Sequence, residues 1–272
     1  DAIKFPDTIA ALSPSPVNNL PDPERFWGFV AQNPESLHMV VWLYSDWGTV
    51  KSFRHINGHS VSTFVWKNLA GKRRLVKYHW LTMQGERCIS RQEAAKLAAS
   101  NPDVAGQELY QALAQGESTR YQLCVQLMEP EEAAALPYDP LDDTKLWDVH
   151  QYPLMPVGEL VLTENPRDYG AEVESAAFSP ANLVEGIELS ADKMLQGRSF
   201  IYWDAQRHRL GKDFRQIPVN HMPGWQPSDM VTSGNGVRVC GYQERSSLNK
   251  SDDFTQAGQY YMALSPTGRQ HL

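Results

Sequence analysis

Strand-like segments on either side of a helical insertion are the feature that most constrains the fold of this chain. Residues 60–82 and 121–128 are rich in β-branched and aromatic residues, and strand character returns at 158–165. Between the first two segments the spacing of the apolar residues changes from that of a strand to that of a helix. Ser90 and Glu93 have the spacing of a capping box, and two helical segments follow them. This order predicts an antiparallel sheet or barrel with helices added to it.

The remaining segments fit the same organisation. Residues 37–46 (LHMVVWLYSD) carry apolar and aromatic residues and are predicted as another strand, whereas PERFWGFVAQ is a short amphipathic piece. Asn68–Gly71 is predicted as the turn of a hairpin within 60–82. After Pro166 the periodic runs become few, with one helix expected from about Ser190 and another capped by Asp252 or Asp253. Three regions are therefore predicted, at 1–165, 166–251 and 252–272.

Composition and charge exclude several classes of partner. The 272 residues carry a formal net charge of −7, which argues against nucleic acid or an anionic membrane surface, since both select basic patches. No window approaches 18 uncharged apolar residues, so no membrane span is predicted. The cysteines Cys88, Cys124 and Cys240 form no CxxC pair and are expected to be buried, reduced thiols. A soluble globular protein is predicted.

Common catalytic motifs are absent from the sequence. It contains no GxGxxG after a strand, no P-loop, no GxSxG and no HExxH. His55 and His59 are four residues apart, a spacing that would suit two metal ligands on one helix face, but both lie in a glycine-containing turn before a strand. We therefore interpret them as solvated turn residues in preference to a metal pair.

The helix expected from Ser190 carries a more informative pair. Arg198 and Tyr202 are four residues apart, so their side chains meet on one helix face. A free phenol has a pKa near 10 and is a poor metal ligand at neutral pH, but a guanidinium beside its oxygen favours the phenolate. The spacing is equally compatible with a core tyrosine and an arginine that extends along it toward water.

The sequence around this pair resembles the haem-ligand region of the monofunctional haem catalases. RSFIYWDAQRHR contains their R-x-F-x-Y-x-D signature, with Arg198, Phe200, Tyr202 and Asp204 in place. Further upstream, four segments resemble the catalase barrel in order: DAIKFPD, PDPERFWGF, ESLHMVVWLYSDWG and KYHWLTMQG. The resemblance covers nearly the whole chain.

This resemblance implies a fold and a set of haem contacts. The fold is α+β: an antiparallel eight-stranded β-barrel with a helical insertion, an extended wrapping segment and the start of a C-terminal helical region. Tyr202 would be the axial ligand of the haem iron and Arg198 would hold it as tyrosinate. Arg209 would pair with a haem propionate. Met194 and Phe178 would line the proximal side of the ring, and Phe5 would lie near its distal face.

The resemblance also implies an activity. It is the disproportionation of hydrogen peroxide to water and dioxygen through a ferryl intermediate, in a homotetramer located in the cytoplasm or the peroxisome. The distal His and Asn of the family precede the segment that resembles DAIKFPD, so we expect this chain to be the central portion of a longer protein and to hold only the proximal half of the site. Two alternatives remain: a catalase-fold peroxidase acting on organic hydroperoxides, and a non-catalytic haem-binding relic.

Many catalases also bind NADPH, and this sequence keeps only part of that pattern. His38, Ser45 and Asn57 match positions that contact the dinucleotide in the family. Other contact positions hold Arg, Lys and His in the NADPH binders, where this chain has Trp47, Leu81 and Val149. Because the lost cations would have paired with phosphate, NADPH binding is not expected.

Overall fold

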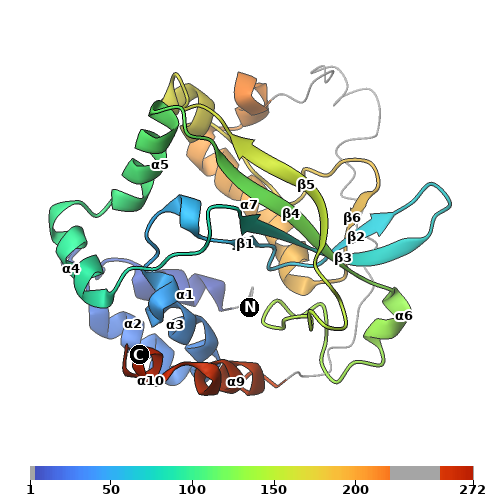
Figure 1. Cartoon of the computed structure of the whole chain (residues 1–272), viewed down its shortest axis with the longest axis horizontal. Coiled ribbons are helices and arrows are strands. Elements are labelled where there is room, and N and C mark those ends of the chain that lie inside the picture. Colours follow the sequence, from blue (N-terminus) through green and yellow to red (C-terminus); the bar gives the residue numbers. More distant parts are fainter. Residues whose placement is uncertain (1–3, 221–251, 272) are drawn as a thin grey trace.

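The computed structural model describes residues 4–220 and 252–271, and its centre is one antiparallel sheet (Figure 1). The hydrogen-bonded order is β5-β4-β3-β2-β6, and β1 pairs with the far end of β3. The strands are β1 (Gly58–His59), β2 (Phe64–Lys67), β3 (Arg73–Thr82), β4 (Thr119–Met128), β5 (Met155–Leu162) and β6 (Ile187–Leu189). Helices surround this sheet, so the coarse prediction of an antiparallel sheet with added helices is confirmed.

The predicted eight strands and closed barrel are not seen in the part of the chain that the structure describes. The sheet there has six strands, and its path ends at β5 on one side and at β6 on the other. Closing a barrel requires an unbroken ladder between the two edges. The described residues provide no strand that joins β5 to β6, so the sheet is open within these limits.

The central hairpin forms as predicted. β2 and β3 pair antiparallel around residues 68–72, and the Asn68 side chain accepts a 2.8 Å hydrogen bond from the Lys72 backbone. Gly71 has a φ of 82°, a left-handed conformation that a residue without Cβ adopts at no steric cost. The Asn and Gly of the turn therefore fix the register of the hairpin, and β3 then pairs with β4 from Leu75 to Thr82.

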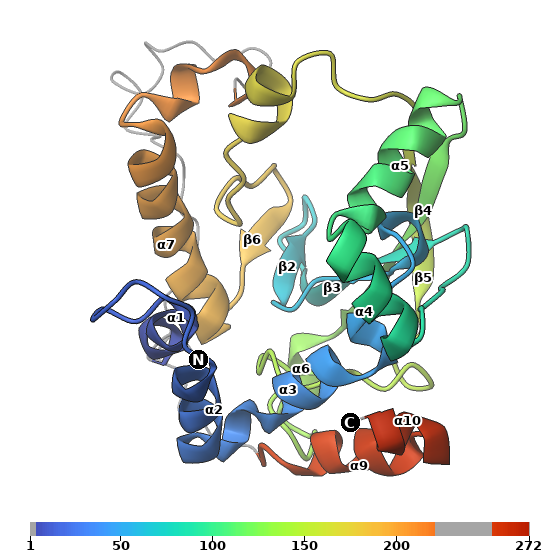
Figure 2. The ribbon, with the colours of Figure 1, turned by 90° about the vertical axis from the view of Figure 1, so that its left-hand side faces the viewer.

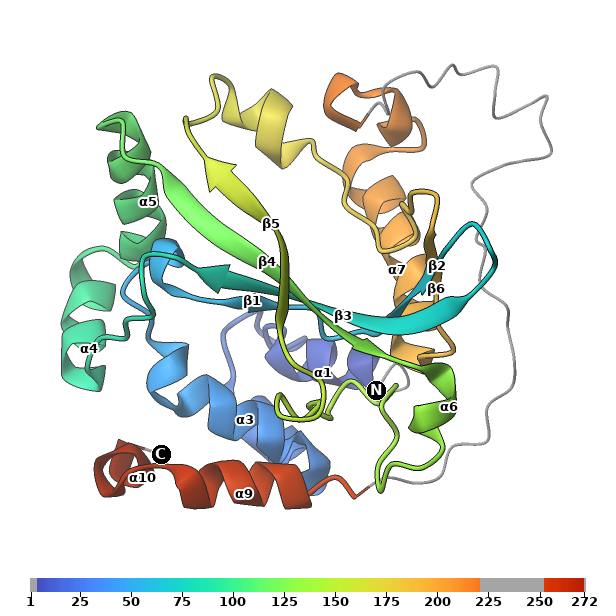
Figure 3. The ribbon, with the colours of Figure 1, turned by 45° about the vertical axis from the view of Figure 1, so that its right-hand side comes forward.

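The helices lie around the ends and edges of the sheet. α4 and α5 are at the end of the sheet where β4 begins, α6 follows the other end of β4, and α9 packs beside α3 (Figures 1 and 3). In Figure 2, β6 lies between α7 and β2. The α-helices are α1 (Phe5–Leu12), α2 (Pro23–Gln32), α3 (Leu37–Tyr44), α4 (Arg91–Ser100), α5 (Val104–Ala114), α6 (Pro130–Ala133), α7 (Lys193–Leu210), α9 (Thr255–Ala263) and α10 (Pro266–His271). Short helical turns occupy Pro34–Ser36, Asp46–Gly48, Phe53–His55, Gly170–Glu174, Phe214–Gln216 and Pro218–Asn220.

The strand predicted at residues 37–46 is wrong, because Leu37–Tyr44 is the helix α3. Every residue of this segment except His38 is apolar, so its pattern does not distinguish a buried strand from a helix. Val40 is buried there, and the Trp42 ring meets the Tyr260 ring of α9 edge-on with centroids 4.4 Å apart. The β-branched and aromatic composition misled the prediction, since packing against α9 outweighs local propensity.

The hydrophobic core lies on one face of the sheet. Val65, Leu75 and Met128 are register neighbours on β2, β3 and β4, so their side chains share that face. The segment between β4 and β5 covers them with Trp147 and Tyr152, both less than 5% exposed. Farther along the same face Lys77 is also buried, and its ammonium donates to the Lys145 carbonyl at 2.9 Å.

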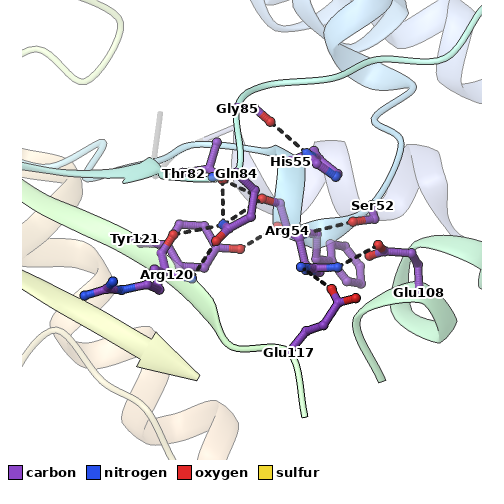
Figure 4. A network of polar contacts seen from close by, with 11 residues as sticks. Ser52, Arg54, His55, Thr82, Gln84, Gly85, Glu108, Glu117, Arg120 and Tyr121 are labelled. Carbon is purple, nitrogen blue, oxygen red and sulfur yellow. Dashed lines mark hydrogen bonds and ion pairs between the residues drawn. The ribbon is translucent and has the colours of Figure 1, made fainter. Parts of the chain in front are cut away.

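A polar network joins the helical insertion to the sheet (Figure 4). The Arg54 guanidinium forms ion pairs with Glu108 of α5 at 3.0 Å and with Glu117 at 2.9 Å, and its side chain is only 13% exposed. Burial would raise the pKa of Glu108, but hydrogen bonds from Ser52 and Arg54 outweigh it and lower that pKa. The Arg54 carbonyl accepts from Thr82 and Gln84 at the end of β3. Arg54 therefore connects α5 to the sheet.

The prediction of buried, reduced cysteines is confirmed for only one of the three residues. Cys124 is a buried free thiol as predicted, but Cys88 is exposed because it lies in the connection after β3, outside the packed layers. Cys240 lies outside the described residues.

No helix among residues 4–220 and 252–271 is long and apolar enough to cross a bilayer. The boundaries at residues 165 and 251 stay predictions.

Candidate functional site

The helix α7, which carries the predicted haem-ligand motif, is fixed to the sheet at its first turn. Asp192 is its N-cap, and the Oδ1 atom accepts a 3.0 Å hydrogen bond from the Leu195 backbone. Leu195 is fully buried and Ser199, one turn later, is 5% exposed, so one side of the helix faces the protein interior. The helix expected from about Ser190 is confirmed, with Lys193 as its first residue.

Arg198 and Tyr202 meet on α7 as their spacing predicts. The Arg198 Nη2 donates to the Tyr202 hydroxyl oxygen at 2.9 Å, and the guanidinium carbon lies 5.2 Å from the centre of the phenol ring. Both residues are half-buried. The phenol oxygen therefore has a guanidinium cation fixed beside it.

A buried acidic pair lies behind Arg198, and sequence reasoning missed it. The other guanidinium nitrogen of Arg198 donates to the Ser62 hydroxyl at 3.3 Å, and that hydroxyl donates to Asp143 at 3.5 Å. Burial raises the pKa of Asp143 to about 7, helped by a hydrogen bond and charge repulsion from Asp192 and opposed by Lys77 and Arg198. No local pattern relates residues 62, 143 and 198, so only the tertiary structure reveals this group.

Two other predicted haem residues share a face of α7 with Tyr202. Met194, Arg198, Tyr202 and Arg209 follow one another at intervals of four, four and seven residues, so they lie along one stripe of the helix. Met194 is half-buried. The Arg209 guanidinium is exposed and donates to the Ala176 carbonyl at 2.6 Å and to the Glu174 carbonyl. Arg209 therefore holds residues 174–176 beside the C-terminal part of α7.

Phe178 lies next to this stripe, whereas Phe5 belongs to a different helix, α1. The Phe178 carbonyl accepts a 3.2 Å hydrogen bond from Gln206, one turn after Tyr202. The Phe178 side chain is 78% exposed, so it presents an uncovered aromatic ring near the site. Phe5 is the first residue of α1 and is 47% exposed.

The residues matched to NADPH contacts are engaged within the protein. The Ser45 hydroxyl donates to the Trp42 carbonyl at 2.7 Å and accepts from the Trp47 backbone and the Tyr260 hydroxyl. Asn57 accepts from the Thr82 backbone at 2.8 Å and donates to Glu86. Burial, followed by the charge of Lys145, lowers the pKa of His38.

His55 and His59 do not form a pair in this structure. His55 is 8% exposed, and its Nδ1 lies 2.7 Å from the Gly85 carbonyl oxygen. The prediction of a solvated turn histidine is therefore wrong for His55, because the 3₁₀ turn places it under the loop that follows β3. His59 is exposed as predicted, but its ring meets His79 of β3.

Comparison with known proteins gives one consistent result. A family model described as catalase matches residues 1–251. A catalase of Helicobacter pylori is 47% identical over an alignment that covers 100% of this chain and 61% of that protein. A peroxisomal catalase of Toxoplasma gondii is 46% identical, with coverage of 81% of this chain and 44% of that protein.

Solved structures agree with the sequence comparison. The structure of a bacterial catalase superposes with a TM-score of 0.88 at 33% identity, covering 100% of this chain and 62% of that one. The chain therefore spans less than two thirds of the length of these relatives. The match to the family model includes α7 and its Arg198–Tyr202 pair. The chain belongs to the catalase family.

Proposed function

We propose that this chain supplies the proximal half of a haem site in a catalase, with Tyr202 as the axial ligand of the iron. One observation carries the proposal: the Tyr202 hydroxyl lies 2.9 Å from a guanidinium nitrogen on a helix whose sequence has the family's ligand motif. Family membership supports haem as the cofactor and hydrogen peroxide as the substrate.

The residues present fit a haem group. A phenol oxygen with a cation at hydrogen-bond distance is the donor that a ferric iron takes from a tyrosine. The Phe178 side chain is 78% exposed, so a large apolar side chain beside the Tyr202 stripe lacks cover within the described residues. A flat apolar ring bound against it would remove this surface from water, at about 25 cal/mol for each Å².

The side chains of this chain then have distinct tasks. Tyr202 would hold the haem iron through its side-chain oxygen, and Arg198 would place its positive charge at that oxygen. Ser62 accepts from Arg198 and fixes the guanidinium plane. Met194 and Phe178 would cover the haem ring on the Tyr202 side, and Arg209, on the same stripe of α7, would pair with a propionate. When bound, haem supplies the two-electron redox chemistry that peroxide disproportionation requires.

Several wider features of the family extend the proposal. The acid–base groups that act on peroxide would come from sequence that the resemblance places ahead of residue 1, and the whole protein would be a catalase that assembles as a homotetramer. The six-stranded sheet would form part of a closed eight-stranded barrel. A cytoplasmic or peroxisomal location fits a family that includes a peroxisomal relative. NADPH binding is not proposed, because Trp47, Leu81 and Val149 replace the family's cations.

Replacing the ligand oxygen tests the proposal directly. Tyr202→Phe keeps the ring and removes the only oxygen of that side chain, so the purified full chain should lose most of its haem and the high-spin ferric absorption. Tyr110→Phe is the matched control, because Tyr110 lies on α5 and is 59% exposed. Unchanged haem content and spectrum in Tyr202→Phe would overturn the assignment.

Turnover distinguishes the activity from its closest alternative. The haem-loaded protein that contains this chain should release dioxygen from hydrogen peroxide, measured with an oxygen electrode. Consumption of an organic hydroperoxide without oxygen release would instead identify a peroxidase on the same fold. Haem binding without either reaction would identify a non-catalytic relic.

A further inference from the structure

Two histidine rings face each other on the sheet, away from the Arg198–Tyr202 pair. His59 of β1 and His79 of β3 are register partners, so their side chains leave the same face of the sheet directly opposite one another. Their ring centroids are 5.2 Å apart and their Nδ1 atoms 2.9 Å apart. His59 is exposed and His79 half-buried, so solvent reaches the pair from the His59 side.

A third side chain determines which nitrogen of His79 carries the proton. The Gln126 amide nitrogen donates to the carbonyls of Trp147 and Tyr152, at 3.3 Å and 2.6 Å. Since both carbonyls can only accept, the amide oxygen of Gln126 is the atom that lies 3.0 Å from His79 Nε2. His79 must then donate from Nε2, which leaves its Nδ1 unprotonated with the lone pair toward His59.

The same arrangement recurs around metal-binding histidines. A ligating imidazole commonly donates its other N–H to a fixed acceptor, which sets the tautomer and the ring orientation. Gln126 is 2% exposed and held by its two backbone partners, so it is a rigid acceptor for His79. His79 is therefore already oriented as a ligand through Nδ1.

Both rings are neutral near pH 7, as metal ligation requires. Burial, followed by the repulsion that a protonated His59 would exert and partly offset by the hydrogen bond to Gln126, lowers the pKa of His79 to about 4. Burial also lowers the pKa of His59, against the opposing charge of Glu86. Lys77 is the other charged group that acts on His79.

We propose that His59 and His79 form a two-histidine chelate for a divalent transition-metal ion, with Cu²⁺ as the preferred ion. Two imidazole nitrogens bound cis, each about 2.1 Å from the ion, lie about 3 Å apart. The Nδ1 atoms are already at this separation, 2.9 Å apart, so ligation needs each ring to turn until both lone pairs point at the ion, without separating the two nitrogens. The proton between the two Nδ1 atoms would move to Nε2 of His59, which leaves both Nδ1 lone pairs free for the ion. Water would complete the coordination.

The choice of ion follows from the ligands. Imidazole suits copper, zinc and nickel, and among divalent ions a nitrogen site binds Cu²⁺ most tightly. The described residues contain no group of three or more His, Cys, Asp or Glu side chains that could enclose a metal, so the site would be open to exogenous ligands. It is independent of the haem proposal, since neither histidine contacts Arg198 or Tyr202 in the described structure.

The test is Cu²⁺ binding by the purified full chain without added haem, at pH 7. Titration against a competing chelator should show a site whose electron paramagnetic resonance spectrum carries hyperfine structure from two imidazole nitrogens. His59→Gln and His79→Gln should each weaken that site by about tenfold or more, because each removes one of the two protein ligands. His150→Gln is the control, since His150 is exposed and belongs to the segment after β4.

Three outcomes would overturn the proposal. They are unchanged Cu²⁺ affinity and spectrum in both variants, loss of the site only in His150→Gln, and a spectrum with a single nitrogen ligand in the wild type. His59→Gln replaces an exposed side chain, so its far-ultraviolet circular dichroism should match the wild type and separate lost ligation from lost folding. Acidification should release the metal, because protons compete with it for the imidazole nitrogens.

Discussion

Asp192 joins the first turn of α7 to the start of β2. Its Oδ1 caps the helix at Leu195, and its Oδ2 accepts a 3.1 Å hydrogen bond from the backbone of Thr63. Asp192 is 1% exposed, and the two segments that it connects lie 129 residues apart in the sequence. One carboxylate thus sets the position of the helix that carries Tyr202 relative to the sheet.

Asp192→Ala should destabilise the fold strongly. The substitution removes a helix cap and leaves the buried Thr63 N–H without a partner, for a loss of about 2–4 kcal/mol in the free energy of unfolding. Urea unfolding followed by circular dichroism measures it. Ser90→Ala is the control, because Ser90 caps the exposed start of α4 and its loss should cost only about 1 kcal/mol. Equal losses in both variants would contradict the structural role of Asp192.

Asp143 should make stability depend on pH. Its pKa is raised from 3.8 when unfolded to about 7 when folded, so between these values the folded state binds more protons than the unfolded state. The contribution of Asp143 to the free energy of unfolding should therefore be greatest below pH 4 and should fall as the pH rises to about 7. Asp143→Asn should lose this fall and be more stable than the wild type at pH 8.

Thermal unfolding between pH 4 and pH 8 measures this effect. Asp7→Asn is the control, because Asp7 is exposed in the first turn of α1 and should leave the pH profile of the wild type nearly unchanged. A profile for Asp143→Asn that parallels the wild type over this range would show that Asp143 is ionised in the folded protein.

Arg54 should contribute more to stability than a surface arginine with a similar ion pair. Arg54→Ala leaves Glu108 half-buried without its partner, for a loss of about 2–3 kcal/mol. Arg120→Ala breaks a pair with Glu159 whose side chains are 48% and 39% exposed, so the loss should stay below about 1 kcal/mol. Chemical unfolding of both variants compares them, and similar losses would contradict the proposed connection of α5 to the sheet.

Arg198 should act on the oxygen of Tyr202, the proposed iron ligand, and not on folding. Arg198→Ala removes the donor to Tyr202, so haem affinity and peroxide turnover should both fall while the circular dichroism stays unchanged. Arg198→Lys keeps the charge but cannot reach Ser62 and Tyr202 with one planar group, so it should restore only part of the activity. Equal spectra and turnover for the wild type and Arg198→Ala would contradict this role.

Local sequence determined the features that depend on neighbouring residues. Asn68 and Gly71 specify the hairpin turn, Ser90 caps α4, and the interval of four between Arg198 and Tyr202 brings them together. Each of these follows from the backbone conformation that a few adjacent residues adopt. The proposed haem-ligand motif of α7 can be recognised for the same reason, since its whole pattern lies within one helix.

Only the tertiary structure decided which distant residues meet. Leu37–Tyr44 is a helix because it packs on α9, and Asp143 lies beside Asp192 because the segment after β4 folds back over the sheet. His59 faces His79 through the register of β1 on β3. Strand register, and the removal of side chains such as Asp143 from water, are set by contacts between segments far apart in the chain. No local spacing encodes them.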